Sequence, residues 1–395
     1  MKVDQICADL VAIRSENPPD HTSDVIEYIR GFLDSLGIGS LVATNVKKQD
    51  NLVTTGDSKP LLLCGHVDVV PAIDDSWKYP PFSSTIKDGY VWGRGASDMK
   101  GGCAALLAAS RMLVEKGQQL PAQLAFVCDE ETGGENGIRY LLKKKLLTPC
   151  DCLIAEPTPL LSPCIGQKGL CRLSLKFSGE PGHGSLYPVI GISAIMEAIQ
   201  VLNFVKILPE RSFPLDQNLK DLIKTSTDVF TREFNINKGH DILERITFNP
   251  GVISGGEKSN VVAQHCDLDL EMRIPWGCNI QTLIDEIMGH ASRATLAKRS
   301  VFEPSITDPS CNFVSLVCRE IEKVQAKKSL PIVHWAASDA RHLRYAGFRV
   351  VEYGPGDLST IHGINERVSV DALMKATHVY HGIMQEYCRH NPSSG

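Results

Sequence analysis

The stretch LLLCGHVDVV, residues 61–70, decides the fold of this chain. It is a short, nearly continuous apolar run, which is typical of a strand buried on both faces of a sheet. An Ala- and Leu-rich segment at 99–115 predicts a helix, and a second apolar run follows at 122–128. A helix is expected at 136–145 and a short strand at 151–155. This alternation predicts an α/β fold with a mostly parallel sheet and helices on both faces.

The pattern changes near residue 170. Residues 171–178 and 266–273 alternate apolar and polar side chains, as expected of strands with one face in water. Helices are predicted at 191–205 and 279–294, whereas residues 207–245 are polar and weakly periodic. These elements indicate a small α+β domain with helices on one face of an antiparallel sheet.

The α/β pattern returns from about residue 312, with a predicted helix at 313–326. The economical interpretation is one discontinuous α/β domain at 1–170 and 294–395. An inserted α+β domain at 171–293 would interrupt it and could act as a lid. A chain of 395 residues is also too long for one ordinary hydrophobic core, which favours two domains.

Composition and charge exclude several classes of protein. The net charge of −5 argues against nucleic-acid binding, and no segment approaches the roughly 18 consecutive apolar residues of a membrane-spanning helix. The N-terminus lacks the features of a secretory signal. The 13 cysteines are odd in number and scattered, which favours free thiols over a disulfide framework. We therefore expect a cytoplasmic protein with no nucleic-acid or membrane partner.

Polar side chains stand at the ends of successive predicted strands. His66 lies in the first apolar run, Glu130 and Glu131 follow the second, and Glu156 follows the third. Asp98 precedes the helix at 99–115. In an open parallel sheet these positions meet at one edge, where ligands bind. Several carboxylates at one edge would repel each other without cations, and imidazole with carboxylate suits zinc, cobalt or manganese.

Each of these residues has a simpler explanation when taken alone. A histidine in an apolar strand is usually a core residue, and an aspartate before a helix is usually an N-cap. A glutamate pair after a strand is ordinarily a solvated loop, and the glycines around Asp98 ordinarily form a tight turn. Their joint occurrence at consecutive strand ends favours a metal site.

The motifs themselves resemble those of a known family. The run GHVDVVP, then GRGASDMKGG, DEETGG and EPT, resembles the M20 metallopeptidases, and most of all their acetylornithine deacetylase and succinyl-diaminopimelate desuccinylase branch. The resemblance continues through GHGSLYP at 182–188, SNVV at 259–262, SDAR at 338–341 and IHGINE at 361–366. It therefore spans nearly the whole chain.

The resemblance implies that residues 1–170 and 294–395 form a catalytic, metal-binding domain with a site for two divalent metal ions. Asp98 would bridge the ions, with His66 and Glu156 as ligands of one and Glu131 and His362 as ligands of the other. Zinc is the expected metal, with cobalt or manganese as alternatives.

The resemblance also implies three catalytic roles. Asp68 would fix the tautomer of the neighbouring imidazole. Glu130 would act as general base on a metal-activated water and then protonate the leaving amine. His183, from the inserted domain, would hold the oxyanion in the active site of a partner subunit, which implies a homodimer.

Substrate contacts are predicted at Lys168, Asn260, Arg273 and Arg341, where relatives place groups that hold carboxylates or polar atoms. A guanidinium suits bidentate recognition of a carboxylate. Each of the four could equally be a surface cation or a turn residue.

The leading interpretation is a zinc-dependent amidohydrolase that releases an amine from an N-acyl amino acid. A carboxypeptidase or dipeptidase acting on short peptides is the alternative within the family. A non-catalytic metal-binding scaffold is the alternative of another class, and the unliganded Glu130 argues against it. Where relatives often have NV[IV]P, the chain has Ala263 in place of proline, which leaves the acyl specificity open.

Overall fold

The computed structural model describes residues 2–19, 21–72 and 76–390. The chain forms two compact units. The first comprises Met1–Ile165, Ile306–Ile332 and Ser338–Gly395, and the second comprises Gly166–Ser305 and Val333–Ala337.

The first unit is built on a sheet with a parallel centre. Six of its strands lie in the order β1-β2-β6-β3-β7-β15. The central strand β3 pairs in parallel with β6 and β7, and β15 pairs in parallel with β7, while β1 and β2 are antiparallel. The bounds are β1 Ser40–Val46, β2 Gln49–Thr54, β3 Leu61–His66, β6 Ala122–Val127, β7 Asp151–Ile154 and β15 Arg349–Glu352. Every residue of β3 is buried, as the apolar run predicts.

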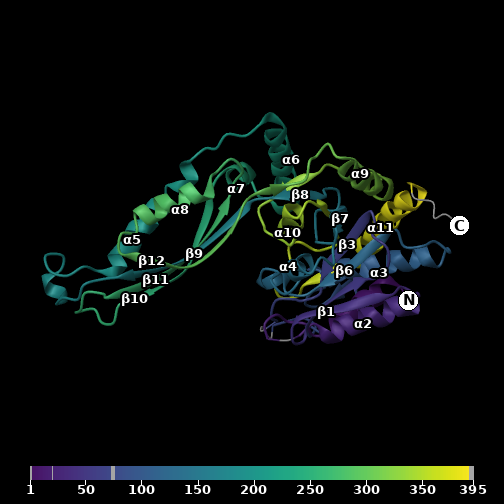
Figure 1. The fold of residues 1–395 in the computed structure, drawn as a ribbon, viewed down its shortest axis with the longest axis horizontal. Coiled ribbons are helices and arrows are strands. Elements are labelled where there is room, and N and C mark those ends of the chain that lie inside the picture. Colours follow the sequence, from purple (N-terminus) through teal and green to yellow (C-terminus); the bar gives the residue numbers. More distant parts are fainter. Residues whose placement is uncertain (1, 20, 73–75, 391–395) are drawn as a thin grey trace. The chain divides into compact units, whose positions relative to one another are not determined.

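Helices cover both faces of this sheet (Figure 1). On one face α3 packs with α1 and α11, and α11 also contacts α9; on the other, α4 packs with α10. The bounds of the helices of this unit are α1 Val3–Ala12, α2 Ser23–Ser35, α3 Lys100–Val114, α4 Ile138–Lys143, α9 Asn312–Gln325, α10 Ala340–Tyr345 and α11 Val370–His390. The predicted α/β class with a mostly parallel sheet is confirmed.

A small antiparallel sheet lies beside the main one in the first unit. Its order is β16-β5-β4, with bounds β4 Thr85–Lys87, β5 Tyr90–Trp92 and β16 Arg367–Ser369. In the β5–β16 register Arg367 is opposite Trp92. The loop after β5 and the loop before β16 therefore run side by side, although more than 260 residues separate them.

The second unit is an α+β sandwich of one sheet and one helical layer (Figure 1). The antiparallel order is β10-β11-β9-β12, and α5 packs on the sheet and against α8. The bounds are β9 Gly169–Ser178, β10 Thr247–Gly255, β11 His265–Ile274, β12 Ala294–Phe302, α5 Ala194–Val205 and α8 Ile280–Gly289. The inward side chains of β9 and β11 meet those of the helices in one apolar core.

Two features of the second unit differ from the sequence-based expectation. The polar segment 207–245 contains two helices, α6 Gln217–Phe234 and α7 Gly239–Glu244. Asp216 caps α6 by accepting a hydrogen bond from the amide of Leu219, and the buried face of α6 is narrow, so a largely polar surface hides its periodicity. The predicted boundary at 293 precedes β12, whereas β12 pairs with β9 along its length.

Within the described part of the chain, no helix combines the length and apolar character needed to cross a membrane.

Candidate metal centre

The polar residues at the strand ends meet at one edge of the first sheet. His66 is the last residue of β3, and Glu130 and Glu131 begin a short 3-10 turn just after β6. Glu156 follows β7, and Asp98 lies two residues before α3. Because β6, β3 and β7 are adjacent parallel strands, their carboxyl ends deliver these side chains to a common place.

Two groups of potential ligands share Asp98. The first is His66, Asp98 and Glu156, and the second is Asp98, Glu131 and His362; within each group the ligand atoms lie within 4.8 Å of one another. His66 Nε2 is 3.0 Å from Asp98 Oδ1 and 3.7 Å from Glu156 Oε1. His362 Nε2 is 3.2 Å from Glu131 Oε1 and 3.4 Å from Asp98 Oδ2. The two oxygens of Asp98 thus face different histidines.

The small sheet explains how His362 reaches this edge. Pairing of β16 with β5 places the preceding loop beside the loop that carries Asp98. The backbone of His362 is left-handed, with φ of 60°. About half of the His362 side chain is exposed, whereas His66 is almost fully buried. The second group of ligands is therefore the more open one.

Asp68 supports both His66 and the glutamate turn. The imidazole Nδ1 of His66 is 2.9 Å from the backbone oxygen of Asp68 and 3.4 Å from its carboxylate. The carboxylate accepts hydrogen bonds from the backbone amides of Glu130 at 3.2 Å and Glu131 at 3.3 Å. The main-chain oxygen is thus the nearer partner of the imidazole, and the carboxylate principally holds the turn.

Asn17 is a supporting residue that the sequence did not single out. Its side-chain nitrogen donates to Asp68 and to Asp129, each at 3.1 Å. Asp129 in turn accepts from the backbone amide of Asn136 and from the hydroxyl of Thr132. Asn17 thereby joins the end of β3 to the turn after β6. Its only sequence signal is that it precedes a Pro-Pro pair, which does not indicate a site.

The centre is an anionic cluster with too little positive charge around it to balance its carboxylates. Burial, and then repulsion from Asp98, raises the pKa of Glu156 well above its usual range. Burial also raises the pKa of Glu131. The pKa values of the two histidines rise in this anionic surrounding. Hydrogen bonds to Asp98 and Glu131 raise the pKa of His362 to about 10. Burial lowers the pKa of His66, but Glu156, Asp68 and Asp98 outweigh it and hold that pKa well above its ordinary value.

This charge balance fits divalent cations. Three carboxylates and two imidazoles, with no thiolate, form a donor set suited to zinc, cobalt or manganese. A divalent cation in each group would neutralise these carboxylates, and its binding would displace any proton from the imidazole that holds it. The arrangement of two ligand groups around one shared carboxylate suits a pair of ions.

Glu130 differs from its neighbour in having no ligand partner. Among the described residues no side chain donates a hydrogen bond to its carboxylate, although its backbone amide is held by Asp68. Burial, followed by repulsion from Asp339 and Glu131, raises the pKa of Glu130 well above its usual range, although His66 opposes this. A carboxyl group of this kind is suited to accept and return a proton.

Asp339, within the SDAR motif, also lies near this centre. It is 2% exposed, and neither of its carboxylate oxygens has a hydrogen-bond partner among the described residues. The Gly134 backbone passes so close that an added Cβ would stand 2.6 Å from Asp339 Oδ1. Burial raises the pKa of Asp339 to about 7, even though Arg341 opposes this. Sequence reasoning named the motif but not this residue.

Two predicted substrate residues have partners inside the second unit. Lys168 is 1% exposed, and its Nζ donates to the backbone oxygens of Ile242 and Arg245, both at 2.6 Å, at the end of α7. Arg273 on β11 donates to Glu271 at 2.8 Å and 3.0 Å. The Lys168 amine therefore caps a helix in this structure, and a role in substrate binding remains a prediction for both residues.

The remaining predicted residues are divided between the two units. His183 and Asn260 lie on neighbouring loops of the second unit, where His183 is exposed and its Nδ1 is 2.8 Å from the hydroxyl of Ser185. The backbone oxygen of Asn260 accepts from the amide of Gly184 at 2.8 Å. Arg341 is buried in the first unit, at the start of α10.

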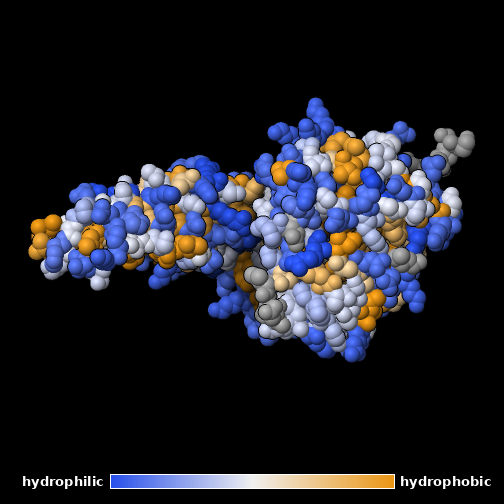
Figure 2. All heavy atoms as spheres, turned by 90° about the horizontal axis from the view of Figure 1, so that it is seen from below, coloured by the Kyte–Doolittle hydropathy of each residue, from blue (hydrophilic) through white to orange (hydrophobic). Residues whose placement is uncertain are grey.

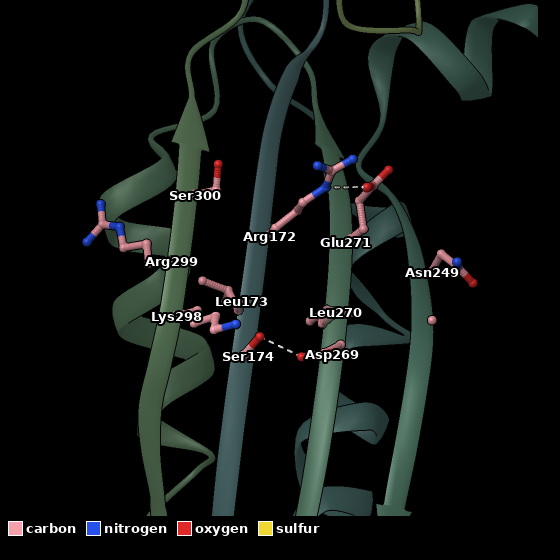
Figure 3. A pocket seen from close by; sticks show the side chains of 11 residues that line it. Arg172, Leu173, Ser174, Asn249, Asp269, Leu270, Glu271, Lys298, Arg299 and Ser300 are labelled. Carbon is pink, nitrogen blue, oxygen red and sulfur yellow. Dashed lines mark hydrogen bonds and ion pairs between the residues drawn. The ribbon is translucent and has the colours of Figure 1, made fainter. Parts of the chain in front are cut away.

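The second unit also carries a hollow whose lining includes none of the predicted substrate residues (Figure 3). It measures about 690 Å³ and lies over the polar face of the four-stranded sheet. Some of its polar side chains pair across the strands: Arg172 donates to Glu271 at 2.7 Å and Ser174 donates to Asp269 at 2.5 Å (Figure 3). Such cross-strand pairs stabilise an exposed sheet face, and the hollow contains none of the grouped ligands.

Comparison with known sequences identifies the family. The model of peptidase family M20/M25/M40 matches residues 62–386, which include every member of the two ligand groups. The chain belongs to this family. M20 peptidases are hydrolases that act on amide bonds, and the predicted resemblance to this family is confirmed.

Individual relatives agree with this assignment. The M20 chain is 28% identical over 353 residues to a succinyl-diaminopimelate desuccinylase of Buchnera aphidicola subsp. Cinara cedri, covering 84% of this chain and 85% of that one. It is 27% identical over 376 residues to probable carboxypeptidase S-like 2 of Dictyostelium discoideum, covering 83% and 71%. An M20 family metallo-carboxypeptidase from Sulfolobus solfataricus has the same fold, with a TM-score of 0.79 at 19% identity over 96% and 98% of the two chains.

Proposed function

We propose that this M20 protein is a two-metal amidohydrolase that releases an amine from an N-acyl amino acid. His66 and Glu156 would hold one ion and Glu131 and His362 the other, with Asp98 between them. The carboxylate-rich donor set, and the similarity to a desuccinylase across most of both chains, support this assignment. Zinc is the expected metal, with cobalt or manganese as alternatives.

The observation that carries the proposal is the difference between two adjacent glutamates. Glu131 contacts His362 within a ligand group, whereas the carboxylate of Glu130 has no donor among the described residues. A binding protein would have no use for a partly buried carboxyl group beside its ligands that binds nothing. An enzyme that must move a proton requires one.

The residues of the chain would divide the reaction between them. Divalent ions bound here would supply the positive charge that activates a water and polarises the scissile carbonyl. Glu130 would take the proton from the attacking water on a carboxylate oxygen and then deliver it to the leaving amine. Asp68 would keep the backbone of this glutamate in place through the turn it holds. General acid–base catalysis of this type contributes about 10²- to 10⁴-fold in rate.

A substrate panel tests this proposal. Purified protein loaded with zinc or cobalt would be assayed for amine release from N-acetylornithine, N-succinyl-diaminopimelate and other N-acyl amino acids. We expect turnover of at least one of these compounds that disappears with a chelator and returns with added metal. A folded, metal-loaded protein that hydrolyses none of them, nor any peptide, would favour a non-catalytic scaffold.

A peptidase is the second candidate. The similarity to a probable carboxypeptidase, over 83% of the chain, supports it. The same metals and the same base would serve, and only the substrate pocket would differ. Dipeptides and N-blocked dipeptides belong in the same panel, and a larger kcat/KM on these than on N-acyl amino acids would assign the chain to this class.

We further propose that the second unit serves as a lid and dimerisation domain. Its loop between β9 and α5 carries His183 and exposes apolar side chains, including Leu186, Val189 and Ile190, of which Val189 is 90% exposed. Apolar atoms are visible on the surface of this unit in Figure 2. An exposed apolar patch of this kind suits contact with a second copy of the chain. His183 would then stabilise the oxyanion in the partner's site.

A further inference from the structure

A buried ion pair joins the two loops that carry Asp98 and His362. Arg94 follows β5 and Glu366 precedes β16, and their side chains are 4% and 0% exposed. Arg94 Nη1 donates to Glu366 Oε2 at 2.5 Å. A backbone hydrogen bond also joins the two loops: the amide of Gly93 donates to the backbone oxygen of Glu366 at 2.8 Å.

Each member of the pair also holds the backbone of a proposed metal ligand. Glu366 Oε1 accepts hydrogen bonds from the amides of Ser97 at 3.0 Å and Asp98 at 3.1 Å. Arg94 Nη2 donates to the backbone oxygen of His362 at 3.2 Å. The two side chains thus form one continuous chain of hydrogen bonds from the Asp98 backbone to the His362 backbone.

We propose that Arg94 and Glu366 are positioning residues that set the spacing of Asp98 and His362 and thereby the affinity for the second ion. This inference rests on the proposed function. Mutation of a residue that holds a metal ligand typically costs about 10- to 100-fold in metal affinity or activity. Asp98 belongs to both ligand groups, but His362 belongs to the second alone. Loss of the pair should therefore weaken the second ion more than the first.

Both side chains are suited to this task for chemical reasons. A carboxylate with two oxygens can bind the two amides with one and the guanidinium with the other, and charge-assisted bonds of this kind are the stronger ones. The guanidinium fork reaches two acceptors at fixed angles, which an ammonium group cannot do. The centroid of the Trp77 ring lies 5.3 Å from the guanidinium carbon of Arg94, so the ring restricts the movement of the guanidinium group. Because Glu366 is fully buried, water cannot replace either contact.

The decisive experiment is a metal titration of the full-length apoprotein carrying Glu366→Gln. Cobalt(II) absorbance and calorimetry would give the affinity of each of two binding events, and the event lost in His362→Ala would mark the second ion. We expect Glu366→Gln to weaken the second event by about 10- to 100-fold and the first event by less. The cobalt spectrum of the second site should also change, which a general loss of stability would not produce.

A matched control is available in the same unit. Arg344 and Glu352 form another buried pair, with Nη2 to Oε2 at 3.0 Å and side chains 4% and 6% exposed. Glu352→Gln should disturb packing to a similar degree and leave the affinity of the second ion within about threefold of wild type, below the effect expected for a group supporting a ligand.

The outcomes separate this inference from the proposed function. If wild-type protein binds two ions and Glu366→Gln binds both with unchanged affinity, the positioning role is wrong and the proposed function stands. If wild-type protein binds no ion, the proposed function itself fails. Should Glu366→Gln not fold, Arg94→Lys replaces it, since it keeps the charge but cannot reach both Glu366 and His362. Unchanged second-ion affinity in Arg94→Lys would equally overturn the inference.

Discussion

Replacement of Asp68 by asparagine separates two roles for this residue. The family resemblance assigns its carboxylate to the imidazole of His66. In the structure the imidazole is closer to the backbone oxygen of Asp68, and the carboxylate accepts hydrogen bonds from Asn17 and from the amides of Glu130 and Glu131. Asp68→Asn keeps the backbone oxygen. The His66 tautomer should therefore survive, while the turn that carries the base should loosen.

The magnitude follows from the three donors, at 3.1, 3.2 and 3.3 Å from the carboxylate. An asparagine offers one oxygen, and its amide nitrogen must face at least one of the three N–H groups. The loss of one or two hydrogen bonds to a charged acceptor costs about 1.5–3 kcal/mol for each bond. We expect the free energy of unfolding to fall by about 3 kcal/mol. If the displacement of Glu130 removes a similar amount of transition-state stabilisation, kcat falls by about 100-fold.

The assay combines urea unfolding, metal content and kcat at saturating metal. We expect two ions per chain in Asp68→Asn, with a reduced kcat and reduced stability. The exposed Asp269, which accepts a hydrogen bond from Ser174 on the polar sheet face, provides Asp269→Asn as a control with little effect. An Asp68→Asn protein with wild-type kcat but weakened binding at the His66 group would refute this reasoning. The carboxylate would then act through the imidazole.

Three further predictions follow from the geometry. Burial, and then Arg273, lowers the pKa of Lys168 to about 7, so the unfolded chain binds more protons than the folded one above that pH. The free energy of unfolding of wild type relative to Lys168→Met should therefore rise from pH 7 to pH 9. In urea unfolding we expect a rise of at most about 1.4 kcal/mol per pH unit. A difference that stays flat or falls would contradict the lowered pKa of Lys168. Gly102→Ala should destabilise the protein, because its Cβ would lie 2.1 Å from the Ala155 oxygen, whereas Gly31→Ala, in open space on α2, should stabilise it by about 0.4–1 kcal/mol in the same assay. Mixing inactive Glu130→Ala with inactive His183→Ala should restore about a quarter of wild-type activity if each site of a dimer uses His183 from its partner; no recovery after verified subunit exchange would argue against shared sites.

Much of the candidate site was predictable because strand ends are visible in the sequence. The apolar run that becomes β3 ends at His66, and those that become β6 and β7 are followed closely by Glu130 and Glu156. Parallel strands bring such ends together. His362 could not be placed in this way. Its position depends on β16, a strand of three residues whose pairing with β5 leaves no periodic signal. Only the family resemblance indicated it.

Other parts were not predictable for identifiable physical reasons. Asn17 and Asp339 act through contacts made across the fold, and neither their type nor their local pattern distinguishes them from ordinary loop residues. The helix α6 was missed because its buried face is narrow and most of its surface is polar. Lys168 illustrates the converse. Its motif indicates a substrate cation, but its amine lies buried against the end of α7, which no sequence pattern reveals.

We propose that Glu131 holds a metal ion whereas the neighbouring Glu130 moves the proton. The most direct measurement is the metal content and single-turnover rate of Glu130→Ala, on the best substrate from the panel, beside Glu131→Ala. We predict that Glu130→Ala retains two ions per chain and loses at least about 10²-fold in rate. Glu131→Ala should instead lose the second ion. A Glu130→Ala protein that loses metal, or that turns over at the wild-type rate, would contradict this division of roles.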